Sequence, residues 1–175
     1  MDVWRPADST ETAVAWISAI ERKNGPTSLV LSRQGIPAIA HDDAQIAAMR
    51  KGAYVVSESS SKANVILIAT GSEVTLAIKS QAALAAEGIH ARVVSMPSTN
   101  VFDRQDQAYK DSVLVPGVKR VAIEAGVSDF WRKYVGLEGE VVGIDTFGES
   151  APGGVLFEHF GFTVENVVKH VKAVL

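Results

Sequence analysis

The chain has 175 residues, of which 47% are hydrophobic and 21% charged, and its formal net charge is −3. This length and apolar content exclude a disordered chain, and the mild acidity offers no basic surface for nucleic acid. The absence of cysteine excludes disulfides, zinc fingers and thiol nucleophiles. No apolar run approaches the roughly 20 residues of a membrane-spanning helix, so we expect a cytoplasmic protein without a membrane partner.

The N-terminal residues follow a strand–helix–strand pattern. Residues 3–6 and 27–32 predict two short strands, and Asp8 with Glu11 has the spacing of a helix-capping box between them. The apolar residues of this helix recur at helical spacing: Ala13, Trp16, Ile17 and Ile20. A βαβ unit of this kind has parallel strands, but two strands do not form a stable sheet alone. We therefore interpret residues 1–33 as the tail of a neighbouring α/β domain.

Residues 34–52 have the composition of a connecting segment. Glycine, proline and polar residues indicate a loop, and 44–50 can form only a short helix. We expect this segment to run over the surface as a linker. Residues 53–56 then predict an edge strand, and the serine-rich stretch 57–62 predicts a solvated hairpin loop.

From residue 65 onward, strands and helices alternate. The run 65–70 is continuously rich in β-forming residues, which is typical of a strand covered on both faces. The pattern then predicts helix 73–87, strand 91–96, helix 103–112, strand 121–125, a short helix 128–134, strand 140–145, and helices from about 152 and from 163. The fold class that follows is α/β, a three-layer arrangement with an open, mostly parallel sheet and helices on both faces. We assign residues 53–175 to this second domain.

The histidines and the strand ends are the first places to search for a site. The four histidines lack the paired spacing of metal ligands, so we interpret them as surface or packing residues: His41, His90, His159 and His170. Glu124 and Asp145 follow strands at the edge where open α/β sheets bind ligands, and two carboxylates there could act as general acid and base. No sequence spacing brings these two together.

Two helix starts could hold an anion, but each has a structural explanation. Gly71-Ser72-Glu73 lies where a strand meets a helix N-terminus, yet Glu73 would repel a phosphate, so we interpret Ser72 as a helix cap. In the same way, Ser150 is predicted to cap a helix that begins at Pro152.

Arg33 is the strongest candidate for contact with a ligand. It follows the strand 27–32 and so emerges at a carboxyl end, where ligands collect. Its guanidinium is permanently charged, and its forked donors suit phosphate or carboxylate. The structural alternative for Arg33 is a surface salt bridge.

Several short motifs, taken together and in order, resemble the C-terminal quarter of transketolase. They occupy residues 4–8, 31–34, 68–74, 92–98, 124–126, 146–152 and 160–163. The resemblance extends over essentially the whole chain. A departure occurs at Gly153-Gly154, where the family usually has better helix formers.

The resemblance implies a homodimeric transferase of the pentose phosphate pathway that uses thiamine diphosphate and a divalent cation, Mg or Ca. Such an enzyme moves a two-carbon ketol unit from a ketose phosphate to an aldose phosphate. By resemblance, residues 1–33 end the pyrimidine-binding middle domain, 34–52 form the linker, and 53–175 form the C-terminal domain. The arginine of the family's Ser-Arg-Gln motif contacts the substrate phosphate, which makes Arg33 the expected substrate-binding residue.

The resemblance also implies what this chain lacks. The family's catalytic, cofactor and metal residues lie upstream, so we expect none among these 175 residues and an inactive isolated chain. Two alternatives remain at this stage. One is a relative similar to dihydroxyacetone synthase, and the other is a non-catalytic module for ligand binding or assembly.

Overall fold

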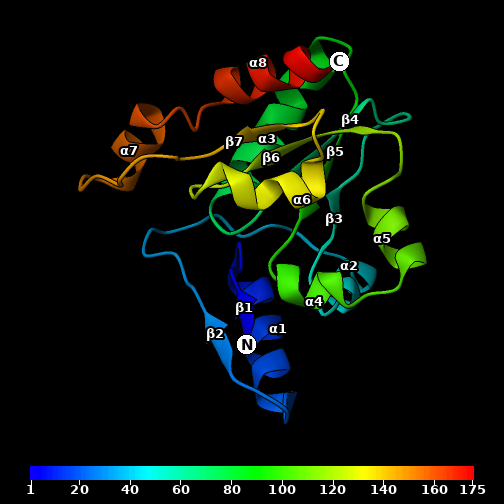
Figure 1. Ribbon diagram of the computed structural model, residues 1–175, viewed down its shortest axis with the longest axis vertical. Coiled ribbons are helices and arrows are strands. Elements are labelled where there is room, and N and C mark those ends of the chain that lie inside the picture. The colour runs from blue at the N-terminus through cyan, green and yellow to red at the C-terminus, as the bar shows by residue number, and fades with distance from the viewer.

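The N-terminal βαβ unit is present in the computed structural model, which describes residues 1–175 (Figure 1). It consists of β1 (Asp2–Trp4), α1 (Ser9–Glu21) and β2 (Thr27–Leu29), and its two strands pair in parallel. The second strand is shorter than predicted, because pairing ends after the Val30 amide donates to the Trp4 carbonyl at 2.8 Å.

The remainder of the chain builds a five-stranded sheet in the order β3-β5-β4-β6-β7. Four of these strands are parallel, and β3 lies antiparallel on one edge. The strands are β3 (Tyr54–Ser57), β4 (Val65–Ala69), β5 (Ala91–Ser95), β6 (Lys119–Ile123) and β7 (Glu140–Val142). The predicted fold class, an open and mostly parallel α/β sheet, is therefore confirmed.

The apolar run of β4 occupies the centre of this sheet. All five of its residues are buried, because β5 and β6 pair with its two edges and helices cover both faces. The hairpin predicted over 57–62 is wrong. The strand β5 lies between β3 and β4, since the crossover through α3 places β5 beside β4 and leaves β3 at the outer edge.

Helices cover both faces of the sheet, as predicted. On one face lie α3 (Glu73–Ala86) and α8 (Val164–Val174), which contact each other (Figure 1). On α8 the inward stripe is Val167, Val168 and Val171. The other face carries α4 (Thr99–Asp103), α5 (Gln107–Val113) and α6 (Arg132–Val135), which follows a 3₁₀ turn.

One predicted helix is divided in two, and one predicted helix cap is wrong. The helix expected over 103–112 is two helices, because the chain breaks after α4 and Asp106 then caps α5 by accepting from the Tyr109 amide at 2.7 Å. The helix expected from Pro152 is α7 (Gly153–His159). Its N-cap is Pro152 itself rather than Ser150, and no side chain accepts a hydrogen bond there.

The connecting segment contains α2 (Asp43–Met49), the short helix that the sequence predicts there. Its capping box pairs Asp42 with Gln45 in both directions. None of the helices in the chain is long and apolar enough to cross a membrane.

The apolar stripe of α1 is largely exposed. Trp16, Ile17 and Ile20 are 53%, 44% and 71% exposed, whereas Val14 and Ala15 on the opposite side of the helix are buried. The helical spacing of the stripe is correct. The stripe is not buried within this chain, because a two-stranded sheet is too narrow to cover both sides of a helix.

Candidate functional site

Arg33 lies beyond the carboxyl end of β2, as predicted. It is four residues after Leu29, the last residue of that strand. Its side chain is exposed, and it belongs to none of the ion pairs of the chain. The alternative interpretation, a surface salt bridge, is therefore not found. The guanidinium keeps all its donors available to an external anion.

A small hollow of about 230 Å³ adjoins Arg33 at this end of the two-stranded sheet. Its walls come from the first turn of α1, from the residues before that turn, and from both chain neighbours of Arg33, Ser32 and Gln34. Both neighbours of Arg33 thus line a concave surface at the carboxyl edge of parallel strands, although Arg33 itself does not.

Asp8 holds the chain that follows Arg33 against α1. One carboxylate oxygen accepts from the Glu11 amide at 2.9 Å and caps the helix. The other accepts from the Ile39 amide at 3.1 Å and lies 2.9 Å from His41 Nε2. The His41 side chain is only 2% exposed, so this histidine is a packing residue.

Glu11 does not complete the predicted capping box. Its carboxylate accepts from the Ala7 amide at 2.7 Å, the Tyr54 hydroxyl at 2.8 Å and the Ser95 hydroxyl at 2.6 Å. Burial is the main cause that raises the pKa of Glu11 above its ordinary value. The carboxylate therefore accepts hydrogen bonds from side chains on β3 and β5, and these bonds fix the βαβ unit to the larger sheet.

The βαβ unit covers the carboxyl edge of the five-stranded sheet. The Arg5 amide donates to the Pro97 carbonyl at 2.7 Å, just beyond β5. The Arg5 carbonyl accepts from the Gly71 amide and the Thr70 hydroxyl, both at 3.1 Å, just beyond β4. This is the edge where open α/β sheets usually bind ligands, and here it is occupied by the chain itself.

Glu124 meets Arg5 at this covered edge. It follows β6, is 2% exposed, and forms an ion pair with the Arg5 guanidinium. Burial raises the pKa of the Glu124 carboxyl to about 7, although the Arg5 charge lowers it and nearby Glu73 raises it further.

Glu73 is the second buried carboxyl at the edge. One oxygen accepts from the Ala125 amide at 3.3 Å and the other from the Ser72 hydroxyl at 3.1 Å. Burial raises the pKa of Glu73. Ser72 is the N-cap residue of α3, as predicted, but its hydroxyl donates to Glu73 and caps no backbone amide.

Glu124 and Asp145, which no sequence spacing brings together, do not pair in the structure. Asp145 is exposed and accepts from the Ser128 amide at 2.9 Å and the Ser128 hydroxyl at 2.7 Å. The carboxyl that accompanies Glu124 is Glu73. The strand order could have predicted this proximity, because both glutamates follow neighbouring parallel strands, β4 and β6, at the same edge of the sheet.

These carboxyls have a structural role rather than the geometry of a catalytic centre. The Arg5–Glu124–Glu73 cluster lies beneath the βαβ unit, where the backbone of Arg5 occupies the edge. No group of three or more His, Asp or Glu side chains in the chain could hold a metal ion. Arg33 is exposed and outside this cluster, and its role as a substrate-binding residue stays a prediction.

Comparison with known proteins agrees with this architecture. The family model described as "Transketolase-like TK C-terminal domain" matches residues 52–163. Transketolase 1 of Vibrio vulnificus (strain YJ016) is 55% identical over 176 residues, which cover 100% of this chain and 26% of that protein. The chain thus spans about a quarter of the length of this curated relative.

Solved structures agree as well. Transketolase of Pichia stipitis in complex with sedoheptulose-7-phosphate has a TM-score of 0.90 and 39% identity, covering 99% of this chain and 25% of that chain. A split-gene transketolase, solved as an inactive beta4 tetramer, has a TM-score of 0.76 and 29% identity. That match covers 100% of this chain and 58% of the other.

Proposed function

The chain belongs to the transketolase family, and on that premise we propose that it is the C-terminal part of an enzyme that transfers a two-carbon ketol unit between sugar phosphates. In this proposal, residues 1–33 end the pyrimidine-binding domain, 34–52 link the domains, and 53–175 form the C-terminal domain. The enzyme would work in the cytoplasm as a homodimer with thiamine diphosphate and a divalent cation.

The observation that carries the proposal is the placement of Arg33. The exposed Arg33 has no internal partner and follows β2 at the carboxyl edge of parallel strands, where its neighbours Ser32 and Gln34 line a hollow. A relative of known structure is described in complex with sedoheptulose-7-phosphate, a ligand with a terminal phosphate. We assign Arg33 to that phosphate, since paired N–H donors match phosphate oxygens.

The residues of this chain would then bind and orient the substrate rather than carry out the chemistry. The cofactor supplies the carbon–carbon bond chemistry, and we place it on residues outside these 175. Arg33 would hold the phosphate, and the Asp8 contacts with Ile39 and His41 would fix the path of the chain that follows it.

A chimera tests the proposal directly. The 175 residues would replace the matching 176 residues of Vibrio vulnificus transketolase 1, and kcat/KM would be measured with sedoheptulose-7-phosphate and with free sedoheptulose. We expect an active chimera in which Arg33→Ala lowers the preference for the phosphorylated sugar roughly 10- to 150-fold. Arg33→Lys should give an intermediate loss, because the charge remains and the fork is lost.

Arg104→Ala is the matched control, because Arg104 forms a structural pair with Asp2. Any loss in this variant should be equal for both sugars. A folded but inactive chimera would contradict the proposed function. An equal loss for both sugars in Arg33→Ala would remove Arg33 from the site.

A further inference from the structure

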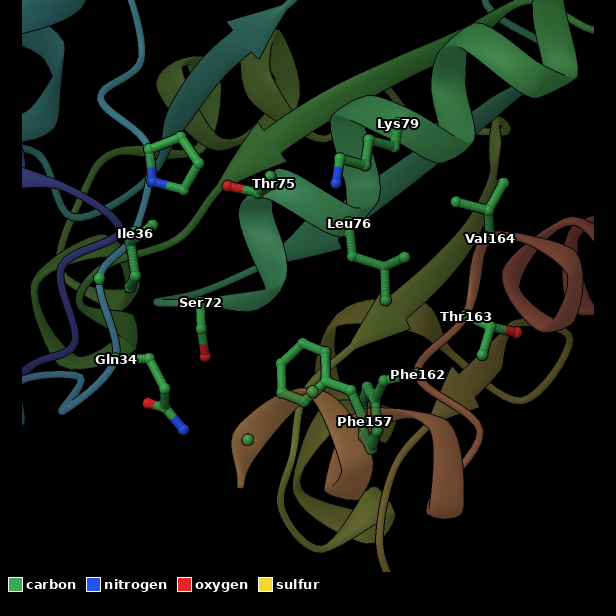
Figure 2. Close-up of a pocket in the computed structure, with 14 residues that line it drawn as sticks. Gln34, Ile36, Ser72, Thr75, Leu76, Lys79, Phe157, Phe162, Thr163 and Val164 are labelled. Carbon is green, nitrogen blue, oxygen red and sulfur yellow. The ribbon is translucent and has the colours of Figure 1, made fainter. Parts of the chain in front are cut away.

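A second concave site lies between the connecting segment and one face of α3. It is a cavity of about 420 Å³, and we call it the α3 crevice (Figure 2). One wall is residues 34–37, the opposite wall is the α3 face, and the floor comes from α7 and the start of α8. The side chains that α3 contributes lie three or four residues apart, at Ser72, Thr75, Leu76 and Lys79.

The crevice carries a single uncompensated charge. Lys79 is the only charged residue among the 14 that line it, and none of them is acidic. Lys79 is exposed and belongs to none of the ion pairs of the chain. In Figure 2 the Lys79 amine is directed back over Leu76 and Thr75. The local electrostatics therefore favour an anion.

Thr75 supplies an unused polar group in the same place. Its hydroxyl oxygen is buried and has no hydrogen-bond partner, not even the carbonyl one turn earlier that helical threonines often use. Buried polar atoms are almost always paired, so an unpaired one facing a cavity indicates a missing partner. Gln34 adds an amide from the opposite wall.

Five hydrophobic side chains give the crevice an apolar surface as well. Phe157 and Phe162 lie with ring centroids 5.4 Å apart, beside Leu76 and opposite Ile36. Such a surface suits the carbon skeleton of an organic molecule rather than a free inorganic ion. A volume of about 420 Å³ lies in the range of small-molecule sites, which combine apolar walls with a few polar groups.

The two glycines that depart from the family pattern help to shape the crevice. A Cβ on Gly153 would lie 2.3 Å from Gln34 Nε2, so glycine lets that amide lie against the start of α7. A Cβ on Gly154 would meet no heavy atom within 4 Å, which leaves that part of the crevice open.

We propose that the α3 crevice binds a small organic anion, whose apolar body lies on Phe157 and Phe162 and whose phosphate or carboxylate lies at Lys79 and Thr75. Lys79 pairs with the anionic group, and the Thr75 hydroxyl donates a hydrogen bond to it. The inference rests on the crevice alone and does not depend on ketol transfer.

The test uses the 175-residue chain with phenyl phosphate as the probe and benzoate as the carboxylate counterpart. Titrations followed by amide NMR shifts should perturb residues 34–37, 72–79 and 153–164. Inorganic phosphate has the anionic group without an apolar body, and benzyl alcohol has the apolar body without an anionic group. We expect both to bind at least 10-fold more weakly than phenyl phosphate. Comparing phenyl phosphate with benzoate identifies the preferred anionic group.

Three variants test the residue assignments. Lys79→Gln should weaken phenyl phosphate at least 10-fold and leave benzyl alcohol unchanged. Thr75→Val keeps the shape and removes the unpaired hydroxyl, so it should weaken phenyl phosphate several-fold without lowering Tm. Lys169→Gln is the matched control, because Lys169 is an exposed lysine on α8 outside the crevice. It should bind like the parent chain.

Three results would overturn the proposal. The first is an absence of NMR shifts at the crevice with both organic anions. The second is an equal affinity for inorganic phosphate, which would reduce the site to an ordinary surface lysine. The third is a folded Lys79→Gln variant that binds phenyl phosphate as well as Lys169→Gln does.

Discussion

The Tyr54 hydroxyl donates a 2.8 Å hydrogen bond to Glu11 Oε1 across the boundary between the five-stranded sheet and the N-terminal βαβ unit. Both side chains are 1% exposed, and Ser95 donates to the same oxygen at 2.6 Å. A buried carboxylate is stable only with such donors around it. The contact therefore makes the docking of α1 depend on two strands of the larger sheet.

Tyr54→Phe should weaken this docking. The change leaves a buried acceptor with one donor fewer, so we expect a loss of about 1–2 kcal/mol in the free energy of unfolding. Amide hydrogen exchange should accelerate mainly in residues 2–29, with β4 and β5 less affected. Tyr109→Phe is the control, because the Tyr109 hydroxyl bonds to the Ala53 carbonyl at 2.8 Å, away from α1. Equal acceleration in both variants would contradict a specific role for Tyr54.

The Glu124 carboxyl should make stability fall as the pH rises toward neutrality. Its pKa in the folded chain is about 7, against 4.5 for the free side chain, and burial is the main cause. Between these values the folded chain binds more protons than the unfolded chain. Stability therefore decreases from about pH 4.5 to 7, by up to about 3 kcal/mol.

Urea unfolding at several pH values measures this effect. In Glu124→Gln the free energy of unfolding should decrease less steeply between pH 4.5 and 7. A residual slope should remain, because burial also raises the pKa of Glu73. The comparison uses slopes alone, since the variant also loses the ion pair with Arg5. Identical slopes in the parent chain and the variant would show that Glu124 does not titrate in this range.

Gly52 and Gly88 should respond differently to the same substitution. Both have positive φ, +87° and +78°, which alone costs alanine about 1–2 kcal/mol. A Cβ on Gly52 would also lie 2.4 Å from the Ser98 carbonyl oxygen and 2.5 Å from the Phe102 amide nitrogen, whereas at Gly88 the space is open. We expect Gly52→Ala to lower the free energy of unfolding by about 3 kcal/mol or more. Gly88→Ala should lower it only by the cost of the backbone conformation, about 1–2 kcal/mol. Equal losses in thermal unfolding would refute the crowding argument.

The isolated 175-residue chain should neither bind thiamine diphosphate in the micromolar range nor transfer ketol units. Magnesium takes oxygen ligands from proteins, and no group of three or more acidic or histidine side chains here could hold a metal ion. Calorimetry with thiamine diphosphate and magnesium checks the first part, and the chimera provides the positive control. Micromolar binding by the isolated chain would contradict the placement of the cofactor on other residues.

The amino-acid sequence by itself determined the features that depend on local patterning. The continuous apolar run at 65–69 indicated a strand covered on both faces, and the valine stripe from 164 to 171 lies on the buried side of α8. The order of strands and helices was enough for the fold class. The motif around Arg33 identified a candidate site residue, because the end of a parallel strand can be read from the chain alone.

Only the tertiary structure decided which groups meet. Glu124 pairs with Arg5 and Glu73 rather than with Asp145, and Glu11 serves Tyr54 and Ser95 rather than its own helix. The α3 crevice joins residues 34–37, 72–79 and 153–164, which are not neighbours along the chain, so no sequence spacing indicates it. The physical reason is common to all three. The periodicity of the sequence indicates which side of a helix or strand is apolar. The partner of a buried polar group depends instead on how distant segments pack, and the order of residues does not indicate that.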